Sequence, residues 1–216
     1  KLISEAAFVF TNSEPLIDFA RPLLRKVVDL GGIGIQDPKP LDEPWDVILS
    51  RRSLNVLISF GTIVTNAQMP QPLKNFFVEL FTTYPNVTFI WKYEDPEDEF
   101  ARSLLASLAN VVLIKWTSQN DLLGDGRVTG FISHAGMASY QEAAARGVPG
   151  IFIPLFGDQP RNAAMMEHNG IGLVLDKREA AQVKFYFPYI YILSFVLAHL
   201  DLFQQNLVLF SAEEVV

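Results

Sequence analysis

The sequence contains no cysteine, and only three of its 216 residues are histidines. The absence of cysteine excludes disulfides, thiol nucleophiles, and cysteine-ligated zinc or iron–sulfur sites. His134, His168 and His199 are scattered along the chain, and no H-E-x-x-H metal motif occurs. Lys and Arg form no cluster, and the net charge is −7. This charge pattern argues against a phosphate-backbone binder, so nucleic acid is not an expected partner.

Short apolar runs alternate with amphipathic segments over most of the chain. Runs of Val, Ile, Leu and Phe without polar alternation are typical of parallel strands buried on both faces of a sheet. The pattern predicts an α/β fold with a doubly wound, Rossmann-like parallel sheet of about six strands. The expected strands are 54–60, 87–92, 111–115, 128–134, 150–156 and 172–175, and the expected helices are 69–84, 97–109, 136–146 and 161–168.

Residues 1 to about 53 have a different pattern, with one strand-like run near residues 6–12 and a proline-rich stretch at 36–46. The proline-rich stretch predicts a linker. The glycines at 31–34 lack the third glycine of a dinucleotide-binding fingerprint and are followed by prolines instead of a helix. We therefore expect a turn there.

Ligands of an open parallel sheet bind beyond the carboxyl ends of its strands, so the residues that follow each strand are the candidates for a site. Four of the expected strands are followed by polar, glycine or tryptophan residues. These are Gly61 and Thr62; Trp116 and Gln119; His134, Gly136 and Ser139; and Asp158 and Gln159.

These residues suit the parts of a nucleotide sugar. Gly136 opens an expected helix whose free amide groups favour a phosphate, while Ser139 and His134 add hydrogen-bond donors. Glu142 lies one turn beyond Ser139 and could accept hydrogen bonds from ribose hydroxyls. Trp116 offers a flat face on which a base could stack. Asp158 and Gln159 suit the hydroxyl groups of a sugar.

Each residue also has a structural explanation when it is taken alone. Trp116 could be a core residue, His134 a hydrogen-bonded structural residue, and Asp158 with Gln159 a helix cap. A Ser–His–Asp hydrolase is disfavoured because the residues around Ser139 do not form G-x-S-x-G. The sequence has no Asp-x-Asp motif to hold a metal diphosphate. We therefore expect no metal and no bound cofactor, with backbone amides and His134 meeting the phosphate charge.

At these residues the sequence resembles the UDP-glycosyltransferases, the family of the glucuronosyltransferases and the plant natural-product glycosyltransferases. The family signature is Trp-x-Pro-Gln, His-x-Gly-x-x-Ser, Glu and Asp-Gln at fixed offsets, and the likeness covers about residues 4–178. The resemblance implies the C-terminal, donor-binding domain of a GT-B glycosyltransferase, with a remnant of the N-terminal domain. It implies that Trp116 stacks on uracil, that Gln119 and Glu142 hold the ribose, that Thr62, His134, Gly136 and Ser139 hold the diphosphate, and that Asp158 and Gln159 take the sugar hydroxyls.

Three positions depart from the family pattern. Ser118 stands where the family usually has Pro, Ala135 replaces a common Gly, and Ala138 replaces a polar Asn near the phosphate. The loss of a hydrogen bond at Ala138 is expected to weaken donor binding by about 0.5–1.5 kcal/mol.

By the same resemblance, the reaction is transfer of a glucuronosyl or glucosyl group from a UDP-sugar to a small lipophilic acceptor, with inversion. The family's general base is a His oriented by an Asp in the N-terminal half, which this sequence does not contain. We therefore expect no catalytic residue in this chain and no transfer by the chain alone. The animal members of the family face the lumen of the endoplasmic reticulum on a membrane anchor, and we expect the same location here.

The expected organisation has four parts. Residues 1–45 are the end of the N-terminal domain with its linker, 46–182 the donor-binding domain, 183–204 an anomalous apolar insert, and 205–216 the start of a following helix. The apolar insert could be a membrane span, a buried helix or a retained intron. We prefer the intron, because codons for Val183 and Gln204 fit splice sites and removing 22 residues keeps the frame.

Two other functions remain as alternatives to a glycosyltransferase represented by its donor-binding part. One is the donor-binding subunit of a split glycosyltransferase that docks onto a separate membrane-bound chain. The other is a non-catalytic UDP-binding module.

Overall fold

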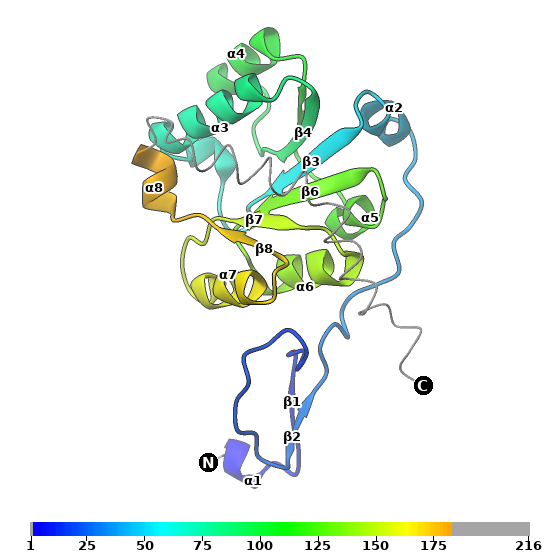
Figure 1. The fold of residues 1–216 in the computed structure, drawn as a ribbon, viewed down its shortest axis with the longest axis vertical. Coiled ribbons are helices and arrows are strands. Elements are labelled where there is room, and N and C mark those ends of the chain that lie inside the picture. The colour runs from blue at the N-terminus through cyan, green and yellow to red at the C-terminus, as the bar shows by residue number, and fades with distance from the viewer. Residues whose placement is uncertain (1, 183–216) are drawn as a thin grey trace.

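The computed structural model describes residues 2–182, and its centre is a six-stranded, all-parallel sheet (Figure 1). The strand order is β5-β4-β3-β6-β7-β8, so the chain starts in the middle, builds one half of the sheet and then crosses over to build the other. This is the doubly wound order of a Rossmann-like fold, as the sequence predicts. The strands are β3 (Leu54–Ser59), β4 (Val87–Lys92), β5 (Val111–Ile114), β6 (Val128–Ser133), β7 (Gly150–Phe152) and β8 (Gly172–Val174).

One face of the sheet is covered by α3 (Gln71–Thr83), α4 (Glu99–Ser107) and α8 (Lys177–Gln182). The core on this face is strongly aromatic, with the rings of Phe77 and Trp91 4.9 Å apart and those of Phe81 and Phe89 4.7 Å apart. These centroid distances lie within the range of favourable ring contacts. Alternate residues of β4, here Phe89 and Trp91, point to the same face because side chains alternate along a strand.

The opposite face is covered by α2 (Trp45–Leu49), α5 (Gln119–Leu123), α6 (Met137–Arg146) and α7 (Gln159–His168). Figure 1 shows α3 and α4 on one side of the sheet and α6 and α7 on the other. Sheet residues of the other parity, Leu57, Ile90, Phe131 and Phe152, fill this second core. Burial of both faces explains why the strands lack polar alternation.

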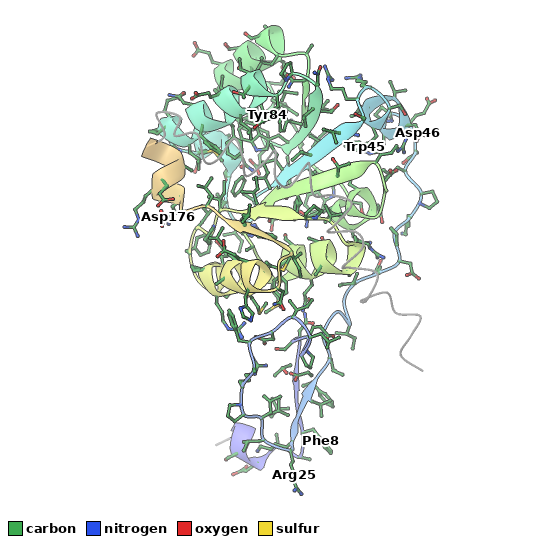
Figure 2. The ribbon with its side chains drawn as sticks, in the orientation of Figure 1. Phe8, Arg25, Trp45, Asp46, Tyr84 and Asp176 are labelled. Atoms are coloured by element: carbon green, nitrogen blue, oxygen red, sulfur yellow. The ribbon has the colours of Figure 1, made fainter. Side chains whose placement is uncertain are left out.

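A small N-terminal unit stands apart from the six-stranded sheet. It contains α1 (Leu2–Glu5) and the parallel pair β1 (Val9–Thr11) and β2 (Val27–Asp29). Figure 2 shows Phe8 and Arg25 at the end of this unit that is far from the large sheet. At its near end, Asn12 and Gln141 of α6 exchange side-chain hydrogen bonds of 3.1 Å, and Asp18 pairs with Arg161 of α7.

The structure confirms the predicted fold class and the turn at residues 31–34, and it also shows elements that the sequence patterns missed. The short helices α2 and α5 and the strand β2 fall in segments for which no element was predicted. β7 ends at Phe152, whereas the pattern predicts a strand to 156, because Pro154 lacks the N–H that a ladder needs. The segments 183–204 and 205–216 lie outside the described residues, and the four-part division of the chain stays a prediction.

The reversal of strand order falls between β3 and β6, which pair directly from Asn55 to Ser59 and from Val128 to Ser133. At such a point the two loops that leave the strands run in opposite directions and open a crevice. The buried amide of Asn55 donates to the carbonyls of Leu49 and Arg127, at 3.0 Å each, and so fixes the two strands at their amino ends. Their carboxyl ends are followed by Phe60-Gly61 and His134-Ala135.

Candidate functional site

A cavity of about 500 Å³ lies at the carboxyl ends of the strands, where the strand order reverses. Its volume falls in the range of small-molecule sites, about 300–1,000 Å³. Nine of the ten site residues predicted from the sequence line it: Gly61, Thr62, Trp116, Gln119, His134, Gly136, Ser139, Glu142 and Gln159. The structure therefore brings together loops that follow β3, β5, β6 and β7.

The imidazole of His134 lies between two glycines. A Cβ atom placed on Gly136 would be 2.5 Å from His134 Nε2, and one placed on Gly61 would be 2.9 Å from His134 Cε1. Both distances are shorter than real Cβ contacts, so neither position accepts a side chain while the ring stays in place. Gly61 also has φ +77°, which L side chains rarely adopt. The two glycines thus let the backbone approach the ring closely from the two adjacent loops.

The protonation state of His134 decides whether its imidazole can donate a hydrogen bond to a ligand. Burial lowers the pKa of its imidazole below the ordinary value, the nearby Lys92 lowers it further, and the Asp158 charge with a hydrogen bond to the Ser59 backbone opposes the shift. A neutral imidazole carries one N–H, so a ring that donates it to the Ser59 backbone has no second N–H for a ligand. Donation to a second acceptor, such as a phosphate oxygen, requires the ring to take up a proton, which an anion in the cavity would favour.

Gln119 is hydrogen-bonded to two other predicted site residues. The Gln119 amide Nε2 donates to Glu142 Oε2 at 2.6 Å and to Ser139 Oγ at 3.1 Å. Gln119 begins α5, while Ser139 and Glu142 lie on α6, so this contact joins the loops after β5 and β6. Burial raises the pKa of Glu142, and the hydrogen bond from Gln119 opposes that shift. The carboxylate is thus partly desolvated beside the cavity and suited to accept from ligand hydroxyls.

Gly136 occupies the N-cap position of α6 and has no side chain that could cap the helix. The first amide groups of this ten-residue helix are therefore available at the cavity, together with the positive end of the helix dipole. Ser139 is buried in the first turn. Ala138, in the same turn, is exposed and lines the cavity.

Trp116 is not a core residue, because 71% of it is exposed. The ring is at the rim of the cavity, in the loop after β5. The structural explanation of an isolated tryptophan as part of the core is therefore wrong here. An exposed indole at a cavity is a platform on which a planar ring can stack.

Asp158 and Gln159 have different surroundings. Gln159 is buried, and its Oε1 accepts from the backbone amides of Leu155 and Phe156 at 2.8 and 3.0 Å. Asp158 is exposed, accepts from the Asn162 amide at 2.8 Å, and forms no side-chain cap on α7. Asp158 is the one predicted site residue that does not line the cavity, although it lies in the same loop as Gln159. Their contact with a sugar stays a prediction.

The structure also shows cavity residues that the sequence patterns missed. Lys92 ends β4, Met137 begins α6, and Phe156 follows β7. Lys92 was missed because it is the last residue of the predicted strand itself, although it lies at the same edge of the sheet as the other candidates. Within residues 2–182, no group of three or more His, Asp or Glu side chains is placed to hold a metal ion. No helix in the same range is both long and apolar enough to cross a membrane.

Comparisons with known proteins give a family match for this chain. The family model described as UDP-glucoronosyl and UDP-glucosyl transferase matches residues 1–185. The chain is 37% identical to ugt-56 of Caenorhabditis elegans, over 83% of this chain and 34% of that protein. It is 34% identical to UDP-glucuronosyltransferase 3A1 of Bos taurus, over 82% of this chain and 34% of that protein. The chain thus spans about a third of the length of the curated relatives it matches.

Solved structures share the fold. LpCGTa in complex with UDP matches 95% of this chain and 50% of its own, with a TM-score of 0.63 and 19% identity. Os79 from O. sativa, also in complex with UDP, matches 77% of this chain and 38% of its own, with a TM-score of 0.57 and 22% identity. The fold is therefore that of a Rossmann-like domain of a GT-B glycosyltransferase, as the sequence predicts.

The glycine contacts of His134 generate a stability prediction. Gly61→Ala combines a positive φ, which costs about 1–2 kcal/mol, with a clash against the imidazole, which costs about a further 1–3 kcal/mol. Gly170→Ala has a similar φ of +68° but nothing within 4 Å of its Cβ, and Gly170 follows α7 at the end away from the cavity. Denaturant unfolding should show a larger loss of stability for Gly61→Ala. Equal losses in the two variants would contradict the packing of His134 against Gly61.

Proposed function

This chain belongs to the UDP-glucuronosyl and UDP-glucosyl transferase family, and from that premise we propose that it supplies the UDP-sugar-binding part of a hexosyltransferase. The enzyme would transfer a glucuronosyl or glucosyl group to a small lipophilic acceptor. The observation that carries the proposal is the hydrogen-bonded group of Gln119, Ser139 and Glu142, which lies in one cavity with His134 and the exposed ring of Trp116.

Each part of a UDP-sugar has a suitable partner in the cavity. Uracil would stack on Trp116, and the ribose hydroxyls would donate to Glu142, which Gln119 holds in place. The diphosphate would bind at Gly61, Thr62, His134, Gly136 and Ser139. The sugar would extend toward Asp158 and Gln159. This direction follows the rim of the sheet from β5 through β6 to β7, so one extended ligand can meet the loops in turn.

The chemistry proposed for this part of the enzyme is positioning of the donor and stabilisation of the departing UDP. Negative charge builds up on the β-phosphate as the bond to the sugar carbon breaks. The helix amides and protonated His134 would stabilise this developing charge more than they stabilise the intact donor. This difference would lower the energy barrier of sugar transfer. The amides require no metal ion for this, and we propose that none takes part.

We further propose that the general base and the acceptor pocket lie outside this chain, so the chain alone transfers no sugar. Two observations support this proposal. All the predicted site residues suit the donor, and the chain covers about a third of the length of its relatives. By resemblance to the animal members, the complete enzyme would be placed at the lumenal face of the endoplasmic reticulum membrane.

Calorimetric titration of the chain with UDP, UDP-glucose and UDP-glucuronate tests the proposed site. Trp116→Ala should weaken UDP binding about 5- to 150-fold, because base stacking contributes about 1–3 kcal/mol. Glu142→Gln should weaken it about 10- to 150-fold, since hydrogen bonds to a charged acceptor contribute about 1.5–3 kcal/mol. The preference between the two UDP-sugars would identify the sugar that is transferred.

Two matched variants control this experiment. Phe8→Ala removes an exposed aromatic ring from the N-terminal unit, and Glu79→Gln neutralises an exposed carboxylate on α3. Neither residue lines the cavity, so both variants should bind UDP like the unmodified chain. The absence of UDP binding to the folded, unmodified chain would overturn the proposal.

The departure at Ala138 predicts a gain of affinity. Ala138→Asn places an amide in the first turn of α6, at the cavity, where one hydrogen bond contributes about 0.5–1.5 kcal/mol, or about 2- to 12-fold in affinity. Ala145→Asn makes the same exchange at an exposed position of the same helix and should leave UDP affinity unchanged. An unchanged or weaker affinity in Ala138→Asn would contradict this placement of the phosphate.

A further inference from the structure

Lys92 is a buried cation at the edge of the cavity that belongs to none of the sequence motifs. It is the last residue of β4, the strand beside β3, and its side chain is 8% exposed. A buried charge is costly unless other groups compensate it. The position of Lys92 therefore calls for a partner of opposite charge.

The contacts of Lys92 join the two loops that form one wall of the cavity. The ammonium donates to the carbonyl of Gly61, in the loop after β3. Its Nζ also lies 5.6 Å from the centre of the Trp116 ring, in the loop after β5, at a distance typical of cation–π contacts. Lys92 thus sits between the place proposed for the phosphates and the place proposed for the base.

The nearest carboxylate compensates this charge only in part. Glu94 Oε1 is 3.6 Å from Lys92 Nζ, which is too long for a hydrogen bond. The same carboxylate accepts from the backbone amide and the side-chain amide of Asn66, at 2.6 and 3.2 Å. Glu94 is therefore shared with the loop after β3. A lysine ammonium has three N–H donors, and within the described part of the chain one acceptor, the Gly61 carbonyl, is hydrogen-bonded to it.

Lys92 is also the one Lys or Arg among the described residues that line the cavity. The diphosphate of a UDP-sugar carries about two negative charges, and the Glu142 carboxylate lines the same cavity. Helix amides supply partial charges of about half a unit. A full positive charge on the wall would balance the ligand better than amides alone.

We propose that the Lys92 ammonium binds the diphosphate of the donor directly while its contact with Trp116 holds the base platform in place. The inference rests on the proposed function, because it assigns Lys92 to the same ligand. Phosphate recognition and base recognition then share one side chain, and the ligand supplies the negative charge that the buried ammonium lacks.

The test compares UDP with uridine, which has the base and ribose but no phosphate, by tryptophan fluorescence titration of the full chain. Lys92→Gln removes the charge and keeps an N–H donor for the Gly61 carbonyl. It should lower the ratio of UDP affinity to uridine affinity about 10- to 100-fold. Lys92→Arg keeps the charge and should keep this ratio within about threefold of the original.

Lys74→Gln is the matched control. Lys74 is also buried, donates to the Ala67 carbonyl at 2.8 Å and lies over the Phe100 ring at 4.7 Å, but it does not line the cavity. This variant should lower stability without changing the ratio of the two affinities. Thermal unfolding of every variant separates loss of folding from loss of binding.

The possible outcomes distinguish direct phosphate binding by Lys92 from the proposed binding of UDP by the chain. A lower ratio in Lys92→Gln, restored in Lys92→Arg, supports the inference. UDP and uridine affinities that fall equally would show that Lys92 acts only through Trp116 and the Gly61 loop, and would overturn direct binding. An unmodified chain that binds UDP, with the same ratio in Lys92→Gln, would overturn the inference and leave the proposed function standing. A folded, unmodified chain that binds no UDP would overturn both.

Discussion

The reversal of strand order between β3 and β6 is the constraint on which the site depends. Because these neighbouring parallel strands send their following loops to opposite faces of the sheet, the backbone diverges at their carboxyl ends and leaves an open crevice. The His134 ring lies at this crevice between Gly61 and Gly136, whose missing Cβ atoms leave room for the imidazole. A side chain at either glycine would move the imidazole, and with it the surface on which the proposed phosphate rests. The fold and the site are therefore linked through two residues that have no side chain.

The distribution of charged groups in the cavity is the second feature that suits the proposed ligand. To bind the proposed diphosphate, a chain of net charge −7 must concentrate positive potential locally. Two sources of positive potential line the cavity, the amino end of α6 and the buried ammonium of Lys92. His134 becomes a third only if a bound anion favours its protonation against the burial that lowers its pKa. Glu142 has the opposite role, since burial raises the pKa of its carboxyl and Gln119 keeps it oriented. A ligand in which a ribose is joined to a diphosphate matches this distribution.

The sequence predicted the six strands well because both faces of the sheet are buried, which leaves long apolar runs as a direct signal. β4 matched its prediction from Val87 to Lys92. The helices α2 and α5 were missed because five residues are too few to show a helical period. The rim residues could be predicted because each follows a strand, whereas Lys92 was missed because it is the last residue of the predicted strand itself. The hydrogen bonds from Gln119 to Ser139 and Glu142 could not, because they depend on how α5 and α6 pack. The different environments of Asp158 and Gln159 could not be predicted either. Asp158 is exposed to solvent, whereas the side chain of Gln159 accepts hydrogen bonds from its own loop.

The proposed function depends on UDP binding in this crevice with its base on Trp116. The most direct measurement is a nitrogen-15 NMR titration that follows the indole N–H signals of the three tryptophans while UDP is added. Trp116 is exposed at the cavity, Trp91 is fully buried in the core, and Trp45 begins α2 and does not line the cavity. We expect a saturable shift of the Trp116 signal with the other two signals unchanged. UDP binding that leaves the Trp116 signal in place would contradict this placement of the base.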